Sequence, residues 1–81
     1  MKVNKEFFQV KIKIYYKKHN IMRGFETNDI EEAKKRFGEM EKAMKANGGE
    51  WLLQLNKVYN NSVMPIKVTS SNGNSFSSPL F

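Results

Sequence analysis

The sequence predicts an α+β domain of type ββαββ, in which a single helix packs on one face of a four-stranded antiparallel sheet. Two observations carry this prediction. Two segments alternate apolar and polar residues, as strands do, and one segment between them has the 3.6-residue period of a helix. The 81 residues suffice for one domain. We expect it over residues 1–69, with a flexible Ser/Asn-rich tail over residues 70–81.

The first alternating segment is predicted to form a hairpin. Residues 6–18 form its first strand and residues 21–27 its second. The turn between them is predicted at His19–Asn20, because asparagine tolerates positive φ. The resulting register brings together residues of like face, as cross-strand pairing favours: Ile14 opposite Phe25, Lys13 opposite Glu26 and Tyr15 over Gly24.

The segment that follows is predicted to be a helix with both ends marked. Asn28 stands where a cap is needed, and Glu31 follows three residues later, as in a capping box. Asn47–Gly48–Gly49 supplies a left-handed stop. Apolar residues in spacings of three and four form one stripe, which is typical of a helix lying on a sheet: Ile30, Ala33, Phe37, Met40 and Met44.

The second alternating segment is predicted to form another hairpin, with its turn at Asn60–Asn61. The register pairs Leu55 with Ile66 and Leu53 with Val68 on the inner face, and Gln54 with Lys67 and Asn56 with Pro65 on the outer face. Pro65 lacks an N–H group, so the last strand should lie at an edge. A right-handed crossover through the helix favours the strand order 2-1-3-4, with one sheet face left open.

The residue content argues against an enzyme. The chain has one histidine, His19, which has no acidic neighbour, and no cysteine. The helical carboxylates alternate with lysines, as on a solvated face, and no glycine-rich phosphate loop is present. We therefore predict a non-enzymatic protein with no catalytic, cofactor or metal site.

Positive charge is the main functional signal. The net charge is +6, and residues 1–27 carry most of it, whereas the helix is balanced. The outer face is predicted to present a basic and polar set: Lys11, Lys13, Tyr15, Lys17, Gln54 and Lys67. Such a face suits nucleic acid or an acidic protein partner, and lysines on strands also serve simply to prevent aggregation.

Apolar residues on the outer face are the second signal. The registers place four of them there, Met22, Leu52, Val58 and Val63, and Phe7 is added as a further candidate. A partner chain, a second copy of the protein, or the tail folded back would cover them. The tail itself ends in Pro79–Leu80–Phe81, which is similar to the Leu–Phe end of bacterial sliding-clamp-binding peptides but lacks their usual glutamine.

A basic hairpin, a Lys/Glu-rich helix and the stretch GGEWLLQLNKVYNNSVMPIKV together resemble small proteins encoded by bacteriophages and other mobile elements, over residues 6–69. This resemblance of pattern carries over no residue roles. It implies a binding protein that inhibits or modulates a host nucleic-acid-handling protein, for example a defence nuclease. The alternative is direct, weakly specific DNA or RNA binding by the lysine-rich face. Without an apolar run long enough to span a membrane, we expect a cytoplasmic location.

Overall fold

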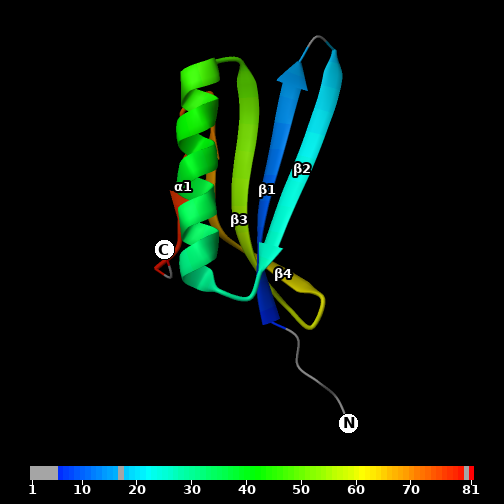
Figure 1. Ribbon diagram of the computed structural model, residues 1–81, viewed down its shortest axis with the longest axis vertical. Helices are drawn as coiled ribbons and strands as arrows, with labels where there is room; N and C mark the ends of the chain where they lie inside the picture. Colours follow the sequence, from blue (N-terminus) through cyan, green and yellow to red (C-terminus); the bar gives the residue numbers. More distant parts are fainter. Residues whose placement is uncertain (1–5, 17, 80) are drawn as a thin grey trace.

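One helix lies across one face of an antiparallel sheet in the computed structural model, which describes residues 6–16, 18–79 and 81 (Figure 1). The described residues form β1 (Glu6–Tyr16), β2 (His19–Thr27), α1 (Ile30–Asn47), β3 (Glu50–Tyr59), β4 (Ser62–Ser70) and β5 (Ser75–Ser77). The sheet order is β2-β1-β3-β4-β5. The predicted α+β class and the order 2-1-3-4 are confirmed. The structure adds β5, which comes from the segment predicted as a tail.

The N-cap of the helix lies one residue later than predicted. Asp29 is the N-cap, and its Oδ1 accepts a hydrogen bond of 3.0 Å from the Glu31 backbone N–H. Asn28 instead donates from Nδ2 to the Glu6 carbonyl at 3.0 Å, which ties the helix entry to β1. At the other end Gly48 has a φ of 72° and its N–H donates to the Met44 carbonyl, so the predicted stop is confirmed.

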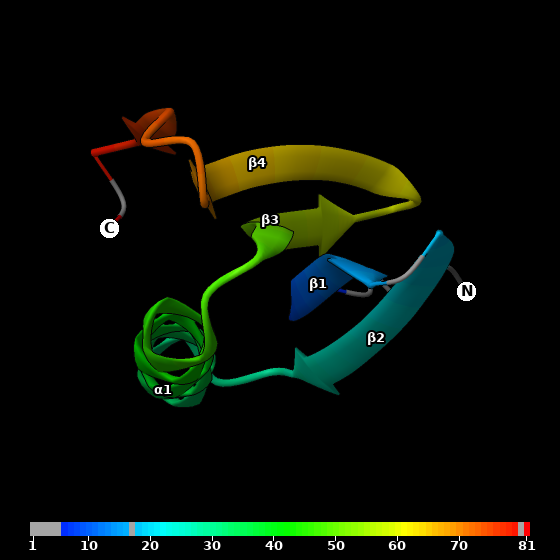
Figure 2. The same cartoon turned by 90° about the horizontal axis from the view of Figure 1, so that it is seen from above.

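The core lies between α1 and the sheet (Figure 2). Its buried members are Phe8, Val10, Ile12, Ala33, Phe37, Trp51, Leu53, Leu55 and Ile66. The predicted apolar stripe of the helix is confirmed, because Ala33 and Phe37 are buried and the other three stripe residues pack against the core. Phe8, Val10 and Ile12 of β1 form the matching layer on the sheet.

The turn of the first hairpin lies two residues earlier than predicted. Tyr16 pairs with His19, and Lys18 takes the positive φ of 69°. Nine cross-strand pairs result, from Phe8↔Thr27 to Tyr16↔His19, which is more than the predicted turn allows. Tyr15 therefore does not cover Gly24, and Lys13 lies opposite Met22 rather than Glu26. The predicted faces nonetheless hold, because every partner moves by an even number of residues.

The second hairpin contains an irregularity that changes which residues share a face. Its turn at Asn60–Asn61 is confirmed by positive φ values of 49° and 69°. Asn56 pairs with Pro65 as predicted, but the register then shifts by one residue, so that Leu55 lies opposite Lys67. Ile66 is the extra residue, as in a β-bulge. The pairings predicted for Ile66, Lys67 and Val68 are wrong for this reason.

Candidate functional site

The sheet face opposite α1 has no element packed over it among the described residues (Figure 2). We call it the open face. The strand registers arrange its side chains in rows that cross the sheet. One row contains Met22, Lys13, Leu52 and Ser70, and the next contains Gly24, Lys11, Gln54, Val68 and Phe76. Neighbours in such rows lie about 5 Å apart, so these rows form one contiguous surface.

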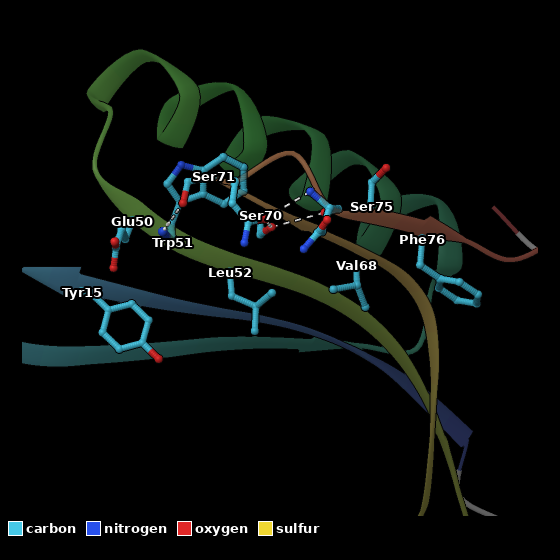
Figure 3. A pocket seen from close by; sticks show the side chains of 11 residues that line it. Tyr15, Glu50, Trp51, Leu52, Val68, Ser70, Ser71, Ser75 and Phe76 are labelled. Atoms are coloured by element: carbon cyan, nitrogen blue, oxygen red, sulfur yellow. Dashed lines mark hydrogen bonds between the residues drawn. The ribbon is translucent and has the colours of Figure 1, made fainter.

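Two adjoining hollows mark the open face. The larger has a volume of about 480 Å³. Figure 3 shows Leu52 and Val68 between Tyr15 at one end and Phe76 at the other. The smaller hollow, of about 240 Å³, is lined by Lys11, Ile12, Lys13, Met22, Leu52 and Gln54. Because Leu52 lines both, the hollows adjoin at this residue, and we refer to them together as the groove.

The turn between β4 and β5 forms the polar rim of the groove and positions Phe76. Ser71 is fixed to the start of β3, because its Oγ accepts from the Trp51 N–H at 3.1 Å and its N–H donates to the Trp51 carbonyl at 3.1 Å. Asn72 holds the turn, since its Oδ1 accepts from the Asn74 N–H at 3.2 Å and from the Ser70 hydroxyl. β5 then pairs Phe76 with Val68.

Both signs of charge border the groove. Lys13 is half-buried, and its Nζ lies 5.1 Å from the centroid of the Tyr15 ring. At this distance the ammonium group makes a cation–π contact with the ring. Lys11 is exposed beside it in the next row. Glu50 lies opposite Tyr15 at one end of the larger hollow. The groove is therefore apolar along its floor and basic along the β1 margin.

Four of the six residues predicted for a binding surface meet in the groove: Lys11, Lys13, Tyr15 and Gln54. Lys17 lies outside the described residues. Lys67 was predicted on the outer face but lies on the helix side, because the bulge at Ile66 reverses the alternation of β4. Its Nζ lies 5.1 Å from the Phe37 ring centroid and 4.1 Å from that of Phe81.

The predicted apolar interface divides into two groups. Met22 and Leu52 line the groove. Phe7, Val58 and Val63 form a separate cross-strand row near the far end of the sheet. Val58 is only 7% exposed, so its surface is already covered within the chain itself.

Sequence reasoning missed Val68 and Phe76, which are two of the five apolar or aromatic residues that line the larger hollow. Two signals in the sequence point to them. Asn72–Gly73 is a strong turn dipeptide, and Gly73 does take a positive φ of 90°. Pro65 marks a place where a ladder is interrupted, and bulges are one of the few strand positions that accept proline.

No protein-family model, no curated protein and no solved structure matches this chain. Within residues 6–16, 18–79 and 81, no group of three or more His, Cys, Asp or Glu side chains is placed to hold a metal ion. α1 is too polar to cross a membrane, and it is the one helix in this part of the chain.

Proposed function

We propose that this is a non-catalytic binding protein whose groove binds another protein. The observation that carries the proposal is that two hollows adjoin at Leu52, on a face that no described element covers. Exposed apolar side chains gather there: Phe76 is 51% exposed, Tyr15 45% and Met22 68%. Contiguous apolar surface with a polar rim is typical of protein interaction sites.

The chemistry of the groove defines the partner segment that would fit it. Leu52 and Val68 offer an apolar floor for one or two anchoring side chains. Lys11 and Lys13 border that floor on one side, so acidic residues flanking the anchors would complement them and speed association. We therefore propose a partner with apolar anchors in an acidic surface.

The resemblance to small phage-encoded proteins extends this proposal to the class of partner, which would be a host protein that handles nucleic acid. A basic groove does not imitate the charge of DNA or RNA. It would instead dock on an acidic surface of such a protein and act by occlusion, blocking access of substrate or of another subunit.

Affinity capture with matched variants tests the proposal. The wild type, Lys11→Glu/Lys13→Glu and Phe76→Ser would each be used to capture proteins from nuclease-treated host lysate. Val63→Ser is the control, because Val63 is 55% exposed on the same face but outside the groove. We expect a protein that the wild type and the control enrich and that both groove variants lose at least tenfold, which corresponds to about 1.4 kcal/mol.

Equal enrichment by all four proteins would contradict the groove as the binding site.

Direct nucleic-acid binding is the second candidate function. Two exposed rings, Tyr15 and Phe76, line one hollow beside Lys11 and Lys13, and bases stack on such rings. Fluorescence anisotropy with labelled single-stranded DNA and RNA decides this case. Binding that weakens steeply with salt and is lost in Lys11→Glu/Lys13→Glu would favour the second function.

A further inference from the structure

β2 forms one edge of the sheet, and its outer side meets no other strand among the described residues. It is nine residues long and pairs with β1 without interruption. In a hairpin with a two-residue turn, the residues that flank the turn form a hydrogen-bonded pair. Counting back from Tyr16↔His19, the backbone groups that face away from β1 belong to Asn20, Met22, Gly24 and Glu26.

The two edges of the sheet differ in how they are protected. The far edge has a proline at Pro65, a bulge beside it and the short strand β5, and each of these hinders pairing with another chain. β2 has neither a proline nor a bulge. Its Gly24 leaves the backbone bare at mid-strand, where a close approach is easiest. The β4–β5 edge is thus protected against pairing with another chain, whereas the β2 edge can accept a strand.

The side chains of β2 complement a second copy of β2 in one antiparallel register. A two-fold axis at Met22, the most exposed apolar residue of β2, places Met22 opposite Met22 of the second copy. The same register places Asn20 opposite Gly24 of the second copy. Lys18 approaches Glu26 of the second copy at both ends. A register centred on residue 23 would oppose two arginines, and one centred on Gly24 would place Met22 opposite a glutamate.

We propose that two copies of the protein associate through β2, antiparallel and about a two-fold axis at Met22, to form one continuous sheet. The axis is perpendicular to the sheet, so both open faces lie on the same side and the dimer presents two grooves together. The interface is narrow and each copy carries a charge of +6, so association is weak and strengthens as salt screens the repulsion. The proposal stands independently of what the groove binds.

Sedimentation equilibrium and cysteine cross-linking test the proposal on the full chain. We expect the average mass to rise toward twice that of one chain at concentrations on the order of 100 µM, and to rise further with salt. Because the natural sequence has no cysteine, Met22→Cys introduces a single thiol. Its two copies would lie about 5.5 Å apart between Cα atoms, a separation that a disulfide spans.

Met64→Cys is the matched control, because Met64 is also an exposed strand methionine, 58% against 68% for Met22, but lies in the β3–β4 hairpin. We expect Met22→Cys to form the covalent dimer at least tenfold faster. Gly24→Pro removes an outward N–H and should abolish the mass increase while the far-ultraviolet spectrum is unchanged. Equal cross-linking of both cysteine variants, faster cross-linking of Gly24→Cys, or a wild type that stays monomeric up to about 1 mM would overturn the proposal.

Discussion

At the scale of single residues, Lys67 shows how a charged side chain packs beside the core. The bulge turns it to the helix side, where its ammonium group lies over the rings of Phe37 and Phe81. These two rings meet edge to face, with centroids 5.7 Å apart. The aliphatic stem of the lysine covers apolar surface while the cation interacts with the ring faces.

A double-mutant cycle between Lys67→Met and Phe81→Ala measures this arrangement. Methionine keeps most of the stem and removes the charge, so the coupling reports the cation–ring interaction. We expect a coupling free energy of about 0.5–1 kcal/mol in urea unfolding. The control is the cycle between Lys34→Met and Phe81→Ala, because the Lys34 Nζ lies farther from the Phe81 centroid, at 5.6 Å. A Lys67 coupling no larger than the control would contradict the interpretation.

At the scale of the elements, the first hairpin shows why faces are easier to predict than pairings. The wrong turn at His19–Asn20 and the observed turn at Lys18 differ by two residues at each strand end, so the inner set is the same in both. The observed turn places Lys18 in the left-handed region, where an L-residue is strained by about 1–2 kcal/mol. The longer ladder offsets that strain.

Glycine substitutions at the two turn positions test this explanation. Lys18→Gly should raise the free energy of unfolding by about 0.5 kcal/mol, because relief of strain exceeds the added entropy of the unfolded chain. Asn20→Gly should lower it by about 0.5–1 kcal/mol, because Asn20 lies within β2. Urea unfolding of both variants measures these changes, and the reverse order would indicate a turn at His19–Asn20.

At the scale of the whole molecule, the last residues join both layers. β5 extends the sheet beside β4 and supplies one wall of the groove through Phe76. Phe81 packs on the helix side against Phe37, and the Ser78 N–H donates to the Ile66 carbonyl at 2.7 Å. The segment predicted as a tail therefore contacts the open face, the bulge and the helix.

Truncation after Ser70 tests this role. The shortened chain loses the partial burial of Phe81 and the pairing of β5, so its free energy of unfolding should fall by roughly 2 kcal/mol. Groove binding should be lost as well, because Phe76 and the polar rim are removed. Thermal and urea unfolding provide the measurement. A shortened chain as stable as the full one would support the flexible tail that the sequence alone predicts.

The sequence by itself determined the type and order of the first five elements, the helix stripe and the core residues of β1. These follow from local periodicity. The face on which a residue lies is still predicted correctly when its predicted strand partner is displaced by an even number of residues. Only the tertiary structure decided which residues share the open face beyond Asn56. There a one-residue bulge places Val68 rather than Lys67 on the open face, and β5 adds Phe76 to that face. At the bulge Ile66 is the unpaired residue and is buried in the core, next to Pro65, which still pairs with Asn56. Such packing has no signature in the alternation of a strand.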